Sequence, residues 1–354
     1  TDCSPHPGSR GPSPDTLEEM SAARKCYMEG NETGAATSIL STAAFHYLPV
    51  QSAGTVYGVI GIRMGETEPD DFENSLATAI LNQCATSMEK EFISRKREEE
   101  TAMAKAEQLR ANGAARLALK TGAFGMPDLA LAIRVASELD FELLTIDGSG
   151  GGTGMGPNDM LDNWGVPSVL LHAKAHDYAF LRAAAGKKVV DLAMGGGLAK
   201  PSQAFKALAL GAPYVKAVCM SRSFMIPAFL GCNIEGALHP ERRERVHGAW
   251  SALPKTVLDI GDTPETIFAG YHALKERLGA DEMAHIPYGA IAMWTMCDRL
   301  GAGLQHHMAG ARKFGVEHID RTDICAANRE TAQETGIPFI TEQDDELARR
   351  IVLG

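Results

Sequence analysis

Four short stretches in the second half of this sequence carry residue types that suit an anionic ligand. They are a lysine followed by a glycine turn at 120–122, glycine-rich loops at 147–154 and 195–200, and a serine–arginine–serine run at 221–223. Glycines let backbone N–H groups approach a phosphate closely, and the start of a following helix adds a favourable dipole. Tight turns also need paired glycines, so each loop alone is weak support. Two such loops on neighbouring strands favour a phosphate-bearing ligand.

Each of these stretches follows a predicted β-strand. The predicted strands cover 116–120, 141–147, 188–194 and 214–220, and helical patterns at 128–139 and 202–210 lie between them. Strands that alternate with helices indicate a parallel sheet, and barrels of this kind place their chemistry at the carboxyl ends of the strands. An eight-stranded barrel needs about 250 residues. Because four units follow Gly113, the predicted fold is the C-terminal half of a TIM-type (β/α)8 barrel over 113–239, with a helical extension over 240–354.

The amino-acid sequences of these loops resemble those of a known family. Segments 145–154, 194–197, 204–212, 222–225 and 230–232 look like the FMN-binding synthase domain of glutamate synthases and their shorter relatives. In that family, reduced flavin passes a hydride to 2-iminoglutarate, which forms from 2-oxoglutarate and ammonia, and the product is glutamate. The resemblance implies an FMN-dependent oxidoreductase of the glutamate synthase type, acting on CH–NH₂ donors.

The resemblance also implies roles for particular residues. Lys120 would lie beside the isoalloxazine, as the catalytic residue, where a cation stabilises the negative charge that builds up on reduction. The flavin phosphate would be held by Gly195, Gly196 and Gly197 together with Arg222 and Ser223. The flavin and substrate side of the pocket would be shaped by Gly148, Ser149, Gly150, Gly151, Gly152 and Thr153. For Asp147, a turn former that closes the Asp-Gly loop is the favoured interpretation.

Three departures from the family pattern restrict the prediction. Ser223 stands where the family often has glycine, and Cys232 lacks the two further cysteines that ligate an iron–sulfur cluster in the large enzymes. There is no glutaminase domain, so on this chain alone glutamine is excluded as the nitrogen source. The expected substrates are 2-oxoglutarate and ammonia, or nitrogen released from glutamine elsewhere. The electron donor is not identified.

The first third of the chain has a different character. Two β-like runs at 43–50 and 55–64 predict a hairpin, and apolar residues at every fourth position from Phe72 to Phe92 predict one face of a long helix that ends near Asn112. Segments 46–50, 55–62 and 104–112 resemble the GAF region of potassium-sensor histidine kinases and the helix that follows it. We therefore expect a partial α+β GAF-like domain over 17–93 and a linker helix over 94–112.

This second resemblance gives an alternative function. No phospho-acceptor motif and no ATP-binding lid follow Asn112, so kinase activity is excluded for this chain. The alternative is a non-catalytic fusion, or a GAF-derived signalling and dimerisation module.

Composition narrows the function classes further. The formal net charge is −11, and the 7 cysteines are scattered without a CxxC pair. The sequence lacks the excess of basic residues that nucleic-acid binding needs and the cysteine cluster that a structural metal site needs. It also lacks an apolar run long enough to span a membrane. We expect a cytoplasmic protein with a disordered segment at 1–16. A half-barrel exposes two strand edges, so we also expect a homo-oligomer.

Overall fold

A computed structural model describes residues 16–64, 71–122, 125–151, 159 and 163–354 of the 354-residue chain. The chain divides into two compact units, Thr1–Gln108 and Leu109–Gly354, and each is described by itself. Of the segment predicted to be disordered, residues 1–15 lie outside the described residues.

The first unit contains a small antiparallel sheet covered by a helix. The sheet has the order β1-β2-β3, and β2 and β3 form the predicted hairpin, which turns at Ala53 and Gly54 with positive φ values of 48° and 80°. The elements are α1 (Leu17–Glu29), β1 (Thr33–Gly34), β2 (Phe45–Ser52) and β3 (Thr55–Arg63). Buried Glu19 accepts hydrogen bonds from the Tyr47 hydroxyl at 2.8 Å and from the Ala44 amide, which ties α1 to β2.

The long helix α2 (Asp71–Ala111) is present, but its apolar residues do not form one face. Each step of four residues turns about 40° past a full helical turn, so five steps place Phe72 and Phe92 about 200° apart. Phe92 lies against the ring of Tyr57 with centroids 6.0 Å apart but is still 57% exposed, and Phe72 is 74% exposed. The prediction of a single apolar face was therefore wrong.

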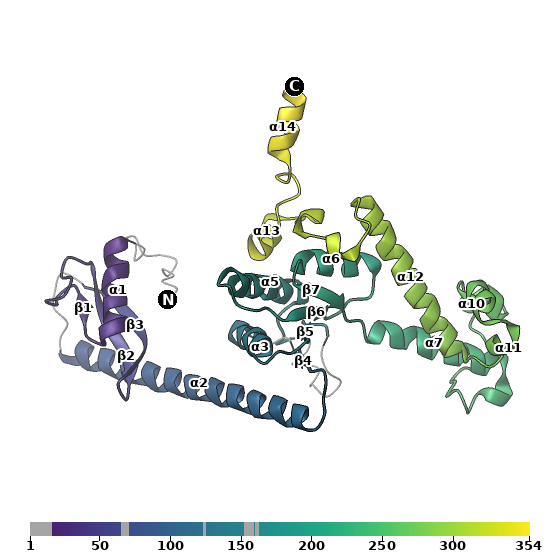
Figure 1. Cartoon of the computed structure of the whole chain (residues 1–354), viewed down its shortest axis with the longest axis horizontal. Coiled ribbons are helices and arrows are strands. Elements are labelled where there is room, and N and C mark those ends of the chain that lie inside the picture. The colour runs from purple at the N-terminus through teal and green to yellow at the C-terminus, as the bar shows by residue number, and fades with distance from the viewer. Residues whose placement is uncertain (1–15, 65–70, 123–124, 152–158, 160–162) are drawn as a thin grey trace. The chain divides into compact units, whose positions relative to one another are not determined.

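The second unit is built on a parallel sheet with the sequential order β4-β5-β6-β7 (Figure 1). Its elements are β4 (Ala118–Thr121), α3 (Met126–Glu138), β5 (Leu143–Asp147), α5 (Ser168–Ala184), β6 (Asp191–Gly195), α6 (Pro201–Gly211) and β7 (Val215–Val218). Right-handed crossovers place consecutive helices on the same face of such a sheet. The main core lies between the two layers and includes Ile133, Leu144, Leu171, Leu192 and Leu208.

The sheet agrees with the predicted strand–helix alternation. Four parallel strands in sequential order are compatible with part of an α/β barrel, and within the described residues the sheet is not closed into one. Residues 109–354 are thus a mixed α/β unit with a helical extension.

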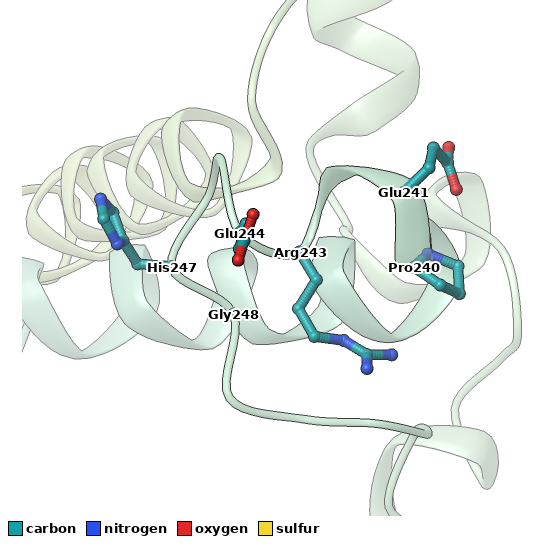
Figure 2. Close-up of a pocket in the computed structure, with 6 residues that line it drawn as sticks. All are labelled: Pro240, Glu241, Arg243, Glu244, His247 and Gly248. Atoms are coloured by element: carbon teal, nitrogen blue, oxygen red, sulfur yellow. The ribbon is translucent and has the colours of Figure 1, made fainter.

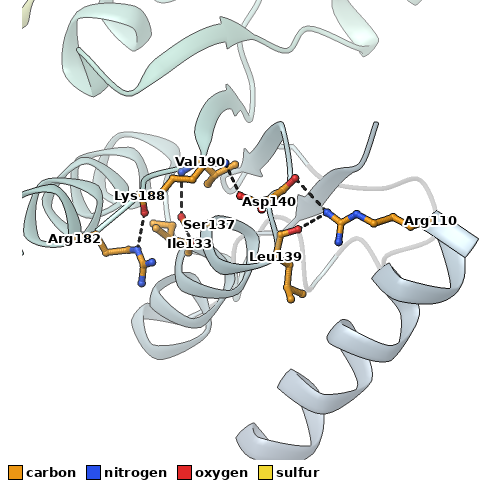
Figure 3. Close-up of polar contacts among 8 residues, drawn as sticks. All are labelled: Arg110, Ile133, Ser137, Leu139, Asp140, Arg182, Lys188 and Val190. Carbon is orange, nitrogen blue, oxygen red and sulfur yellow. Dashed lines mark hydrogen bonds and ion pairs between the residues drawn. The ribbon is translucent and has the colours of Figure 1, made fainter. Parts of the chain in front are cut away.

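The amino ends of the strands are fixed by a set of polar contacts (Figure 3). The Ser137 hydroxyl donates to the Ile133 carbonyl at 2.6 Å and accepts from the Val190 amide at 3.1 Å, which joins α3 to the start of β6. Lys188 pairs with Asp140 at 2.6 Å. In barrels this end of the sheet serves stability, and the carboxyl ends serve function.

After β7 the chain is helical, as predicted. The helices are α7 (Arg222–Leu238), η1 (Pro240–Arg242), α8 (Lys255–Leu258), α9 (Pro264–Ile267), α10 (Tyr271–Leu278), α11 (Ala280–Met283), α12 (Tyr288–Gly310), η2 (Val316–His318), η3 (Arg321–Asp323), α13 (Arg329–Thr335) and α14 (Asp345–Leu353). Helix α12 packs closely on α7 at Gly231, where glycine is required: an added Cβ would overlap the carbonyl of Tyr288. None of the described helices is long and apolar enough to span a bilayer.

Candidate functional site

The carboxyl ends of β4 and β5 bring together a lysine and an aspartate. Lys120 stands opposite Thr145 in the parallel register, and its Nζ lies 2.9 Å from Oδ2 of Asp147. The side chain of Lys120 is 48% exposed and that of Asp147 is 10% exposed. A carboxylate so little exposed is costly unless a partner compensates its charge, and Lys120 is that partner.

Backbone hydrogen bonds close the described part of the first glycine-rich loop after β5. The amide of Gly148 donates to the Gly195 carbonyl at 3.1 Å, and that of Ser149 to the Val166 carbonyl at 2.8 Å. The amide of Gly151 donates to the Gly148 carbonyl at 2.9 Å. The interpretation of Asp147 as a turn former stays a prediction, because residues 152–158 of this loop lie outside the described residues. In the described part, these three donors are satisfied by carbonyl groups, and the carboxylate pairs with Lys120.

The two glycine-rich loops lie against each other. A Cβ on Gly151 would overlap both Oδ1 of Asp147 and Cα of Gly196, and a Cβ on Gly196 would meet the Gly148 carbonyl at 2.6 Å. Gly196 also has φ +112°, a conformation that side chains rarely adopt. Both positions therefore require glycine for the close approach of one backbone to the other.

Ser168, at the start of α5, links the two loops by hydrogen bonds. Its hydroxyl lies 3.1 Å from the carbonyl oxygen of Ser149 and 2.9 Å from that of Gly196. One turn further along α5, His172 is buried, and its Nε2 has no hydrogen-bond partner among the described residues. Burial lowers the pKa of His172 to about 4, against the opposing effects of the Ile146 and Gly195 backbone and the Asp147 charge. At neutral pH the imidazole is uncharged.

The start of α7 adds a second cation to the site. Arg222 donates from Nη2 to the carbonyl of Gly150 at 2.7 Å, and Ser223 donates from Oγ to the carbonyl of Leu198 at 3.3 Å. Arg222 thus contacts the first loop, and Ser223 contacts the loop that follows β6. Among the described residues, no side-chain hydrogen bond caps the first turn of α7.

The ten candidate residues within the described part of the chain lie at this one edge of the sheet. They are Lys120, Gly148, Ser149, Gly150, Gly151, Gly195, Gly196, Gly197, Arg222 and Ser223, linked by the contacts above. Gly152 and Thr153 lie outside the described residues.

Sequence reasoning missed the ion pair that Asp147 makes, and it missed Ser168 and His172 behind the loops. The first was detectable, because Lys120 and Asp147 end neighbouring predicted strands, where opposite charges come within reach. His172 directly follows the apolar residues 169–171 of α5, and a histidine at such a place signals a buried polar group at most.

The residues present at this edge of the sheet suit the phosphate and the ring edge of a flavin mononucleotide. Gly197 has φ +70°, and no atom of the described residues lies within 4 Å of the place its Cβ would take; a Cβ on Gly150 would lie 3.9 Å from Cα of Gly197. A patch without side chains therefore lies beside the guanidinium of Arg222 and near the uncapped start of α7. This arrangement suits a phosphate, and half-exposed Lys120 supplies a cation for an anionic ring edge or a carboxylate.

A hollow of about 560 Å³ lies beyond the carboxyl end of α7 (Figure 2). It is lined by Pro240, Glu241, Arg243, Glu244, His247 and Gly248. The side chains fan out from the backbone, and the Arg243 guanidinium donates to the Gly236 carbonyl at 3.1 Å. This hollow gathers no set of convergent polar groups. In the described part of the chain, no group of three or more His, Cys, Asp or Glu residues suits a metal ion.

Comparison with known proteins identifies part of the chain. Residues 94–241 match the family model described as a conserved region in glutamate synthase. No curated protein and no solved structure matches the chain. The matched stretch includes every candidate residue named above, and it supports a glutamate synthase-like domain. The resemblance of residues 20–112 to a GAF region has no supporting match and stays a prediction.

Proposed function

We propose that the second unit binds FMN and catalyses hydride transfer of the glutamate synthase type, converting 2-oxoglutarate and ammonia to glutamate. The observation that carries the proposal is the joining of Lys120, both glycine-rich loops and Arg222 at the carboxyl edge of a parallel sheet. That edge lies within the stretch matched by the glutamate synthase family model.

The chain's own residues divide the binding work between two ends of the site. Arg222 and the uncapped first turn of α7 would hold the phosphate, and the side-chain-free backbone at Gly197 would let it approach closely. When bound, FMN supplies the hydride that reduces 2-iminoglutarate. Lys120 would lie at the other end, where its ammonium stabilises negative charge on the ring edge or on a substrate carboxylate. Nitrogen would arrive as ammonia, or from glutamine hydrolysed on another chain.

The active form is proposed to be a homo-oligomer in which a second copy covers the open sheet. Within the described residues, β4 pairs with β5 alone and β7 with β6 alone, so each outer strand has a free hydrogen-bonding edge. Sedimentation of the purified chain is expected to give a dimer or a larger species, and a strictly monomeric chain would contradict this part.

The test of the flavin site is an absorbance spectrum of the chain after incubation with FMN and removal of the excess. Wild type is expected to retain the flavin bands, and Lys120→Ala to retain less. Lys188→Ala is the matched control, because this lysine pairs with Asp140 at the amino ends of the strands. Folded wild type without bound flavin would refute the proposal and leave the non-catalytic alternative.

A further inference from the structure

The carboxylate of Asp147 lies where the ends of three structural segments meet. One oxygen, Oδ2, faces Lys120 at 2.9 Å. The other, Oδ1, fills the space beside two glycines: it would be 2.9 Å from a Cβ on Gly195, and it would overlap a Cβ on Gly151. The carboxylate is thus held on one side by loop backbone and on the other by an ammonium group.

Lys120 needs such an anchor more than a lysine inside a sheet would. It lies on β4, which pairs on one side in the described residues, and its side chain is 48% exposed. A free lysine side chain has a large rotamer entropy, so an ammonium without a fixed partner samples many positions. Asp147 is the more buried partner and belongs to β5, which has neighbours on both sides. The rigid partner therefore sets where the mobile one lies.

We propose that Asp147 is a positioning residue that acts through Lys120, holding its ammonium over the place where the flavin ring and the substrate meet. The proposal rests on the proposed function and deepens it. Asp147 itself sits behind Lys120 and the glycines, so it is not assigned a contact with the ligand. The same role explains why two neighbouring positions are glycine, because a side chain at Gly151 or Gly195 would displace the carboxylate.

The first test is read without flavin. The rate at which an amine-acylating reagent modifies Lys120 is measured by peptide mass mapping, with Lys216 on β7 as the internal reference. In Asp147→Asn, Lys120 is expected to react about threefold faster, the order that corresponds to losing a half-exposed ion pair. Gly195→Ala keeps every charge but displaces the carboxylate, so it is expected to raise the same rate while Lys216 stays unchanged. An unchanged rate at Lys120 in Asp147→Asn would overturn the proposal.

The second test is a double-mutant cycle on FMN affinity, which separates positioning from a purely structural role. Asp147→Asn is expected to lose most of the affinity that Lys120→Ala loses. In the Lys120→Ala background, Asp147→Asn is expected to change nothing further. An equal loss in both backgrounds would mean that Asp147 only spaces the loops, and the proposal would be wrong. Absence of flavin binding by wild type would refute the proposed function, whereas the acylation rates decide on Asp147 alone.

Discussion

Gly197→Ala should separate flavin binding from folding. The backbone at Gly197 has φ +70°, so alanine there costs about 1 kcal/mol of stability through left-handed strain alone, because no atom of the described residues lies within 4 Å of the added methyl group. For a unit of this size, that lowers the melting temperature by roughly 2–4 °C. If the flavin phosphate lies on this backbone, the methyl group displaces it and breaks one charge-assisted hydrogen bond or more. Each is worth about 1.5–3 kcal/mol, which corresponds to roughly a 10- to 100-fold loss of FMN affinity.

Gly186→Ala is the matched control for this substitution. Gly186 also has φ +70° with nothing within 4 Å of its Cβ position, and it follows α5, on the side of the sheet remote from the glycine-rich loops. It should show the same small decrease in melting temperature with unchanged FMN affinity. Melting is followed by circular dichroism, and affinity by the quenching of FMN fluorescence. Wild-type affinity in Gly197→Ala, or an equal loss in Gly186→Ala, would refute the placement of the phosphate.

Three further outcomes follow from single residues. Gly196→Ala should cost about 3 kcal/mol by thermal unfolding, because left-handed strain adds to overlap with the Gly148 carbonyl; a loss like that of Gly197→Ala would contradict this. The pKa of His172 is about 4 in the folded protein and near 6.5 when unfolded, so the unfolded state binds more protons between these values. As the pH drops from 6.5 to 4, the free energy of unfolding from urea titrations should thus fall by about 3 kcal/mol more in wild type than in His172→Leu. The same pH dependence in both proteins would contradict this prediction. Burial raises the pKa of Cys26 to about 11, so iodoacetamide should modify exposed Cys297 well before Cys26; equal rates would count against burial.

The sheet could be predicted from the sequence because its signals are local. The apolar run at Leu143–Asp147 and the glycines after it mark both the strand and the turn, and the sequential order follows from the helices between strands. The prediction for α2 was wrong for the opposite reason. A spacing of four residues looks like a helical face over two turns, but its drift accumulates over six apolar positions, and only the hairpin decides which of them are covered.

The candidate site shows the same division between local and long-range signals. The sequence shows that positions 196 and 197 are glycine, but it does not show why each must be. At Gly196 an added Cβ would overlap Gly148 and Ser168, whereas at Gly197 it would meet no described atom within 4 Å. That difference depends on contacts between residues tens of positions apart in the chain, such as the 28 that separate Ser168 from Gly196. The partner of Asp147 is of the same kind, since an Asp-Gly pair alone favours a local turn.

The two ends of the proposed flavin site depend differently on the open sheet. The proposed phosphate end lies at β6, the loop after it and the start of α7, where Arg222 contacts Gly150 and Ser223 contacts Leu198 within this unit. The ring end rests on Lys120, which lies on an outer strand, so solvent reaches it unless another chain covers β4. A ring shielded from solvent is needed for hydride transfer more than for phosphate binding. FMN affinity should therefore be nearly independent of protein concentration, whereas turnover per subunit should rise as subunits associate.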